Sequence, residues 1–333
     1  MKKIKIAQIG TSANSHGNDI FNCLKKQNDI FDIVGFAFPE NEREKYPERM
    51  ADFEGYTELT VDEILNDPTI EAVTVETEER YLTNYALAAA KHGKHIHMEK
   101  PGGTILSDFE RLIATVKKNG TVFHTGYMYR YNPYIIELID KIKKGKLGEI
   151  ISVEAQMNCV HSKAQRVWLE NYKGGSMFFL GCHLIDLILQ IKGKPEKIIP
   201  LNKSTGIDGT RSEDFGMAVL EYKNGTSFAK VNSNEIGGYA RRQLVVSGTK
   251  ETVEIKPFEM FAQGGLFTAR TEYKSGDWGD RGETSESPVY DRYDAMMRAF
   301  AEMVCGEKQN PYTYDYELEL YKTILKCSGV DLK

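Results

Sequence analysis

Short apolar runs alternate with amphipathic stretches over the first 125 residues. The runs, each of a length that suits one strand, are KIKIAQIG, DIVGFAF, AVTVET, HIHMEK and TVFHTGYM. The stretch between the last two runs has apolar side chains at helical spacing: Phe109, Leu112, Ile113 and Val116. Ser107 and Glu110 predict a capping box at the start of that helix. Strands that alternate with helices predict a parallel sheet covered on both faces.

The pattern changes after residue 125. Residues 151–159 alternate strictly between apolar and polar side chains, which predicts a strand with one face exposed to water. Asn224-Gly225, between two further strand-like runs, is a strong hairpin signal. Asn132-Pro133 suits a helix start, and two more helical stretches lie around 296–304 and 316–325. We expect an open, mainly antiparallel sheet with helices on one face.

The length of the chain indicates more than one hydrophobic core. Cores stop growing at about 250–300 residues, and this chain has 333. We therefore expect two α/β domains. Residues 1–125 would hold the doubly wound parallel sheet, and residues 126–333 the large open sheet.

Charge and cysteine usage narrow the classes of function. The formal net charge of -5 gives no general attraction to nucleic acid or to an anionic membrane. The five cysteines are scattered and form no C-x-x-C pair, which argues against a disulfide framework or a zinc site. The chain shows neither a signal-peptide pattern nor a run of about 18 apolar residues. We expect a cytoplasmic protein without a metal.

The segment IGTSANSHG follows the first predicted strand, at the place where a dinucleotide-binding chain carries G-x-G-x-x-G. Here the three positions hold Gly10, Ser12 and Ser15. The first glycine of such a loop makes a tight turn, and the second lets the backbone approach a pyrophosphate. Serine is small, and its hydroxyl can donate to a phosphate oxygen. Taken alone, this segment fits two interpretations about equally well. It is either a dinucleotide site or a turn without a ligand.

The end of the second predicted strand bears on the choice between NAD and NADP. An acidic residue usually lies there and binds the ribose 2′-hydroxyl of NAD. Phe38 occupies that place, where it can pack on the adenine, and Glu40 follows two residues later. Arg43 and Lys45 are candidates to bind a 2′-phosphate, although these charges also suit an ordinary helix surface. Both cofactors stay open, with NAD slightly favoured.

Two further segments carry candidate catalytic groups. Glu99-Lys100-Pro101 ends a predicted parallel strand, and ligands bind beyond the carboxyl ends of such strands. A lysine there can donate to a substrate hydroxyl or carbonyl, or it is an ordinary residue at a strand end. His183 and Asp186 share a helix face, so that Asp186 can orient the imidazole while His183 exchanges a proton. The alternative is a histidine that merely satisfies a neighbouring carboxylate.

Together these segments resemble the Gfo/Idh/MocA oxidoreductases, which include glucose–fructose oxidoreductase and inositol dehydrogenase. The resemblance covers nearly the whole chain, through IAQIGTS, ALAAAKHGKHIHMEKPGG, GYMYRYNP, GGSMFFLGCHLIDL, EDFGMAVLEYKNG and NPYTYDYELEL. Its most specific part is EKP combined with G-x-H-x-x-D. It implies a Rossmann domain, followed by an α/β domain whose large open sheet often forms the oligomer interface.

The resemblance also implies roles for individual residues. Lys100 corresponds to the family's catalytic lysine, His183 to its acid/base histidine and Arg130 to a basic residue near the substrate. Several sugar dehydrogenases of the family carry Asp where this chain has Phe179, a change that removes a hydroxyl acceptor. The candidate cofactor-binding residues are Gly10, Ser12, Ala13, Phe38, Glu40, Thr77, Glu78, Glu99 and Lys100. The candidate substrate-binding residues are Tyr127, Arg130, Trp168, Tyr172 and His183.

By this resemblance, the predicted function is NAD(P)-dependent hydride transfer to or from a sugar, cyclitol or related polyol. One alternative is a glycosidase that oxidises, eliminates and re-reduces its substrate with a retained NAD. Another is a dinucleotide-binding regulator that responds to sugars, against which the presence of both Lys100 and His183 argues. We expect a homodimer or homotetramer with a small carbohydrate or polyol as substrate, and neither nucleic acid nor membrane as a partner.

Overall fold

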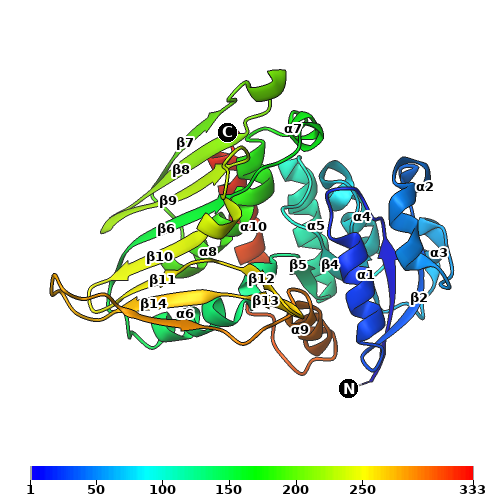
Figure 1. Ribbon diagram of the computed structural model, residues 1–333. Coiled ribbons are helices and arrows are strands. Elements are labelled where there is room, and N and C mark those ends of the chain that lie inside the picture. Colours follow the sequence, from blue (N-terminus) through cyan, green and yellow to red (C-terminus); the bar gives the residue numbers. More distant parts are fainter. Residues whose placement is uncertain (1, 333) are drawn as a thin grey trace. The chain divides into compact units, whose positions relative to one another are not determined.

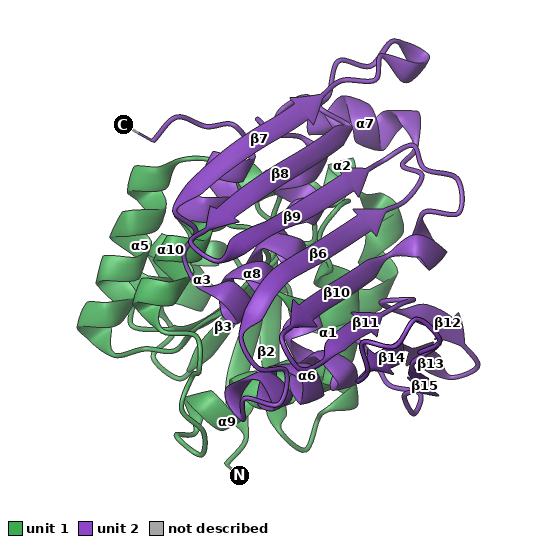
Figure 2. Cartoon of the chain, turned by 90° about the vertical axis from the view of Figure 1, so that its left-hand side faces the viewer, with its two compact units in different colours: residues 1–128, 293–321 green, residues 129–292, 322–333 purple. Residues whose placement is uncertain are grey.

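The computed structural model describes residues 2–332 and divides into two compact units (Figure 2). Unit 1 comprises Met1–Met128 and Tyr293–Tyr321, and unit 2 comprises Tyr129–Arg292 and Lys322–Lys333. The sequence-based boundary at 125/126 placed everything after it in one domain. The structure instead groups helix α9 (Asp294–Val304) and the first half of α10 (Tyr314–Cys327) with unit 1.

Unit 1 contains a parallel five-stranded sheet in the order β2-β1-β3-β4-β5, which confirms the predicted doubly wound fold. The strands are β1 (Ile4–Ile9), β2 (Phe31–Ala37), β3 (Ala72–Val75), β4 (His95–Met98) and β5 (Phe123–Thr125). The chain leaves β2 at one edge and crosses to the other side of β1 to form β3. The carboxyl ends of β1 and β3 therefore mark the switch point where such sheets bind ligands.

The helices of unit 1 are α1 (Gly17–Lys26), α2 (Glu42–Lys45), α3 (Val61–Asn66), α4 (Glu79–Lys91) and α5 (Leu106–Asn119), followed later by α9 and α10 (Figure 1). The face predicted for α5 is buried as expected. The predicted capping box is wrong, because the N-cap of α5 is Ile105, two residues before Ser107, and its side chain makes no capping hydrogen bond. Across residues 2–332 no helix has the length and apolar composition needed to cross a membrane.

Unit 2 contains an eight-stranded sheet in the order β15-β14-β11-β10-β6-β9-β8-β7. The strands are β6 (Ile150–Asn158), β7 (Lys197–Lys203), β8 (Phe215–Tyr222), β9 (Gly225–Asn232), β10 (Gln243–Gly248), β11 (Thr252–Ile255), β14 (Ala269–Tyr273) and β15 (Glu283–Glu286). Only β6 and β9 pair in parallel, so the sheet is mainly antiparallel, as predicted. A separate small hairpin joins β12 (Met260–Ala262) to β13 (Gly265–Phe267).

One face of this sheet is covered by helix. Val153, Ala155 and Met157 of β6 are buried, and α8 (Cys182–Lys192) packs against β6. The remaining helices of unit 2 before α10 are α6 (Pro133–Lys143) and α7 (Lys163–Leu169). The predicted start of α6 is confirmed, because the Asn132 side chain accepts from two backbone N–H groups of its first turn. The predicted hairpin is also present, with Gly225 as the first residue of β9.

The opposite face of the same sheet turns toward the viewer in Figure 2. Its apolar side chains gather on the strands at one edge. Val219 of β8 pairs with Phe228 of β9, both half-buried, and Leu201 of β7 is 45% exposed. A row of partly exposed apolar side chains on the open face of a sheet is suited to self-association.

We therefore expect a dimer or tetramer that uses this face. Val219→Lys with Phe228→Lys places two charges in the row and should shift the protein toward monomer, because a buried unpaired charge is costly. Ile236→Lys, in an exposed loop outside the sheet, is the matched control. Analytical ultracentrifugation at micromolar protein measures the mass of the wild type and of each variant in solution. A wild-type species of 37.7 kDa would contradict the expectation.

Candidate active site

The turn after β1 lies directly against the loop that follows β3. Gly10 has φ of +88°, and a Cβ placed on it would lie 2.5 Å from Cγ2 of Thr77. The Ser12 N–H donates to the carbonyl of Glu76 at 3.0 Å. Glycine is therefore required at position 10 for both backbone conformation and space. The turn thus lies at the switch point between β1 and β3.

The turn has properties that suit a phosphate group. Within residues 2–332 the buried hydroxyl of Ser12 has no hydrogen-bond partner, and His16, the N-cap residue of α1, makes no side-chain capping hydrogen bond. A buried hydroxyl without a partner is costly, and a helix N-terminus favours an anion. Ser15 is also buried, whereas Ala13 is exposed at the tip. These residues fit the pyrophosphate of a dinucleotide.

Two charged residues that the sequence analysis did not select, Glu42 and Arg49, contact this turn. The Glu42 carboxylate accepts from the Thr11 N–H at 2.8 Å. Arg49 donates to the Thr11 hydroxyl at 3.1 Å and to the Ser15 carbonyl at 3.3 Å. Burial raises the pKa of Glu42 to about 7, against the opposing effects of the Thr11 N–H and Arg49. Neither residue lies at a motif position, so spacing in the sequence gave no signal for them.

The residues predicted at the end of β2 have protein partners. Phe38 packs on Phe36 and Phe53, with ring centroids 4.7 and 4.9 Å away. The Arg43 guanidinium lies over Phe38 and pairs with Glu58. The Glu40 carboxylate accepts from the Tyr85 hydroxyl at 2.8 Å. Their assignment to adenine or ribose stays a prediction.

Glu99 and Lys100 directly follow β4, as predicted, and both are 2% exposed. One Glu99 oxygen lies 3.0 Å from Nδ1 of His16, and the other lies 3.7 Å from Nζ of Lys100. Burial favours the protonated form of Glu99, but His16 and Lys100 outweigh it and lower the pKa of this carboxyl. The pair places a lysine ammonium at the carboxyl end of the sheet beside an ionised carboxylate.

Glu76 and Glu79 follow β3 and are buried beside this pair. Within the described chain, none of their four carboxyl oxygens has a hydrogen-bond partner. Burial, with the nearby Glu99, raises the pKa of Glu76 well above its ordinary value, and burial raises that of Glu79 to about 8. Of the predicted residues between them, Thr77 is buried, and Glu78 accepts from Arg80 at 2.9 Å.

In unit 2, the predicted residues Arg130 and Asp186 pair with each other. Two parallel hydrogen bonds of 3.0 and 2.8 Å join the guanidinium to the carboxylate, and Gln190 donates to the same carboxylate at 2.9 Å. Both charged side chains are almost completely buried. The roles predicted for Asp186, as the group that orients His183, and for Arg130, beside the substrate, stay predictions.

His183 lies in the first turn of α8 and is 2% exposed. Its ring meets Tyr129 edge to face, with centroids 5.0 Å apart. The Tyr129 hydroxyl donates to Glu259 at 2.7 Å and accepts from Arg242 at 3.2 Å. Tyr129 is thus fixed by two charged groups, and it restricts the orientation of the imidazole.

Aromatic side chains gather on the segment that precedes His183. Phe179 lies in a π-helical turn and packs edge to face on Trp168 at 5.2 Å. Trp168 also contacts Tyr172 at 4.9 Å. Trp168 is half-buried and Tyr172 is buried, while Tyr127 belongs to unit 1 and is buried too. Phe179 is therefore held by packing, and a carboxylate in its place would lose these ring contacts.

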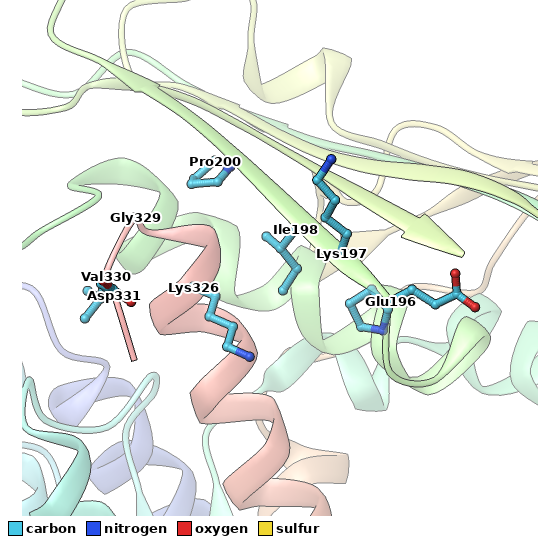
Figure 3. Close-up of a pocket in the computed structure, with 9 residues that line it drawn as sticks. Glu196, Lys197, Ile198, Pro200, Lys326, Gly329, Val330 and Asp331 are labelled. Carbon is cyan, nitrogen blue, oxygen red and sulfur yellow. The ribbon is translucent and has the colours of Figure 1, made fainter. Parts of the chain in front are cut away.

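A cavity of about 320 Å³ elsewhere in unit 2 contains none of the predicted residues. It lies between the start of β7 and the end of α10, where Lys197, Ile198 and Lys326 line it (Figure 3). Its lining of lysines, carboxylates and prolines includes no histidine or aromatic ring. The candidate active site therefore rests on the residues described above.

Two family descriptions match the sequence. "Oxidoreductase family, NAD-binding Rossmann fold" matches residues 4–127, and "GFO/IDH/MocA C-terminal domain" matches residues 135–254. The chain belongs to the Gfo/Idh/MocA family. The predicted family and fold class are therefore confirmed.

Two curated relatives of this Gfo/Idh/MocA chain illustrate the family. An uncharacterized oxidoreductase of Rhizobium meliloti is 28% identical over 203 residues, 59% of each chain. The scyllo-inositol 2-dehydrogenase (NADP(+)) of Bacillus subtilis is 27% identical over 164 residues, 49% of this chain and 46% of the relative. The matches thus span only about half of these relatives' length.

Among solved structures, a 3-ketoreductase of Actinomadura kijaniata, in complex with TDP-benzene and NADP, superposes with a TM-score of 0.76. The match has 17% sequence identity and covers 97% of this chain and 96% of the other. At this identity the likeness establishes the fold of the Gfo/Idh/MocA chain.

The buried Glu79 predicts a pH dependence of stability. Its pKa is raised to about 8 in the folded protein, against about 4.3 in an unfolded chain. The folded state binds more protons between these values, so the free energy of unfolding should fall as pH rises through this window. Glu79→Gln should raise that free energy by on the order of 5 kcal/mol at pH 8 and by little at pH 4.5. Urea unfolding at a series of pH values measures the free energy of unfolding, with Glu78→Gln as the control. An equal effect of Glu79→Gln at both pH values would contradict the prediction.

The Arg130–Asp186 pair predicts a different effect on stability. Arg130→Met leaves the buried Asp186 carboxylate without its cation and should lower the free energy of unfolding by about 3–5 kcal/mol. Arg130→Met with Asp186→Leu removes both charges and should recover most of this loss. Urea unfolding of both variants provides the comparison. A double variant less stable than the single one would show that the buried charge is not the cause.

Proposed function

We propose that the chain is a nicotinamide-dependent oxidoreductase that transfers a hydride to or from a sugar, cyclitol or related polyol. The observation that carries the proposal is the buried Lys100, which lies beside Glu99 at the carboxyl end of β4 within the family's EKP motif. The named activities of the Bacillus subtilis and Actinomadura kijaniata proteins support the substrate class.

In this proposal the dinucleotide binds at the carboxyl edge of the sheet in unit 1. Gly10, Ser12 and the start of α1 would hold the pyrophosphate, and Thr77 and Glu99 would lie toward the nicotinamide. The bound nicotinamide supplies or accepts the hydride. Arg49 would add a positive charge on the same turn. NAD is slightly favoured over NADP.

Lys100 and His183 act on the substrate oxygen in this proposal. The Lys100 ammonium donates to it and stabilises the negative charge that develops when a hydroxyl loses its proton. His183 takes that proton in the oxidation and returns it in the reduction, since an imidazole nitrogen can accept and donate a proton. Glu99 keeps the ammonium oriented, and Tyr129 restricts the imidazole ring.

A substrate screen tests the proposal. Protein freed of retained cofactor is mixed with NAD or NADP and a panel of sugars, cyclitols and polyols, and the absorbance of the reduced nicotinamide is followed. At least one compound should be oxidised in a cofactor-dependent reaction. A glycoside that loses its aglycone without net change in reduced cofactor would indicate the oxidation–elimination alternative. Dinucleotide binding without any turnover across the panel would favour the regulator.

Substitution of Lys100 and His183 tests their roles. Lys100→Met keeps the length of the side chain and loses its charge, and His183→Ala removes the imidazole. Each should lower turnover about 10²–10⁴-fold and change dinucleotide affinity little. The double variant should fall well short of the product of the two losses, because groups that act on one oxygen are not additive. Lys117→Met, on the exposed surface of α5, is the control. Near-normal turnover in Lys100→Met would show that this lysine is only a strand-end residue.

A further inference from the structure

Two arginines share a buried carboxylate in unit 2. Glu259 is 1% exposed, and its two oxygens accept from Nε and Nη2 of Arg292 at 3.0 and 2.7 Å. This forked pair uses both oxygens of the carboxylate and matches one cation with one anion. Arg242 approaches the same carboxylate only at 3.5 Å, and within residues 2–332 no other carboxylate lies within ion-pair distance of it. Arg242 is therefore the cation in excess.

Arg242 has more hydrogen-bond donors than the protein satisfies, although it is only 8% exposed. Its Nε donates to the Asn158 carbonyl and its Nη1 to the Tyr129 hydroxyl, both at 3.2 Å. In the described part of the chain, Nη2 donates to no oxygen. The Cys159 thiol lies beside the guanidinium, but burial raises the pKa of this thiol, so it supplies no negative charge at neutral pH. Because a buried cation without its own counter-ion is costly, the site favours an anion from outside the chain.

The guanidinium of Arg242 lies close to the candidate acid/base residue His183. Tyr129 joins the two, because its hydroxyl accepts from Arg242 and its ring meets His183 edge to face at 5.0 Å. One tyrosine side chain thus separates the cation from the imidazole. Asp186, on the same helix as His183, is neutralised by Arg130 and does not cancel the charge of Arg242.

We propose that Arg242 binds a carboxylate of the substrate, and that the substrate is a sugar acid or polyol acid rather than a neutral sugar. Nη2 has two N–H groups for charge-assisted hydrogen bonds to such a carboxylate. A single excess positive charge matches a monoanion, whereas a phosphate monoester carries close to two negative charges at neutral pH. Uronic and aldonic acids have a carboxylate several bonds away from a hydroxyl that His183 could deprotonate. The inference rests on the proposed function and specifies its substrate class.

Binding of ligand pairs that differ at one carbon tests the proposal. Isothermal titration compares D-glucuronate with D-glucose, and D-gluconate with D-glucitol, with and without saturating NADH or NADPH. In at least one pair, the wild type should bind the acid about 10–100-fold more tightly, the scale of hydrogen bonds to a charged group. Arg242→Met removes the charge and should abolish this preference while changing the affinity for the neutral ligand little. Arg241→Met, at the exposed neighbouring position, is the matched control and should keep the preference.

The outcomes separate the inference from the proposed function, because binding decides the inference even where no turnover is seen. Equal affinity for both members of each pair, or a preference that persists in Arg242→Met, would overturn the inference. Tighter binding of D-glucose 6-phosphate than of either acid would overturn it too. Absence of cofactor-dependent turnover with acids and neutral ligands alike would instead count against the proposed function.

A second variant keeps the inference testable if Arg242→Met does not fold. Arg242→Lys retains a positive charge but loses the planar fork of N–H donors. It should bind the acid less tightly than the wild type does and the neutral ligand equally well. Unchanged affinity for the acid in Arg242→Lys would show that the guanidinium does not contact the carboxylate.

Discussion

The close approach of Gly10 to Thr77 is the constraint on which the candidate cofactor site depends. A side chain at position 10 would overlap the loop after β3, so the turn after β1 can lie at the switch point only if that residue is glycine. The contact fixes where the turn presents Ser12 and the start of α1. It also brings the acidic loop after β3 next to the turn, through the hydrogen bond between Ser12 and Glu76.

The two units differ in how their buried ionisable side chains are paired. In unit 2, Arg130 and Asp186 neutralise one another through two hydrogen bonds. In unit 1, three buried carboxyls surround one buried lysine, and burial holds two of them toward the neutral form. Such an imbalance of buried ionisable groups is typical of sites that move protons or bind charged ligands.

The periodic features of the fold could be predicted from the sequence. The parallel sheet of unit 1, the alternating strand β6 and the buried face of α5 follow from patterns with periods of 2 and 3.6, which reflect local geometry. The start of α5 was missed because the helix begins at Leu106 without a side-chain cap, so that the capping signal of Ser107 is not used. The place of α9 in unit 1 was missed because the chain returns there after more than 160 residues in unit 2. Long-range returns leave no periodic signal.

The residues of the candidate site also fall into two groups, those that local motifs reveal and those that only long-range contacts reveal. EKP and G-x-H-x-x-D selected Lys100 and His183 as candidates, because these motifs are local. Glu42 and Arg49 were missed because their contacts with the turn join residues more than 30 positions apart. The pairing of Arg130 with Asp186, 56 residues away, has the same origin.

Isothermal titration of NADH and NADPH into wild-type protein and Gly10→Ala tests the central claim most directly. The protein must first be freed of retained cofactor, and circular dichroism must show that both proteins are folded. We predict binding of one dinucleotide per chain to the wild type, and much weaker binding to Gly10→Ala, because the added methyl group displaces the turn from Thr77. Absence of binding by the wild type, or equal affinity in a folded Gly10→Ala protein, would contradict the account.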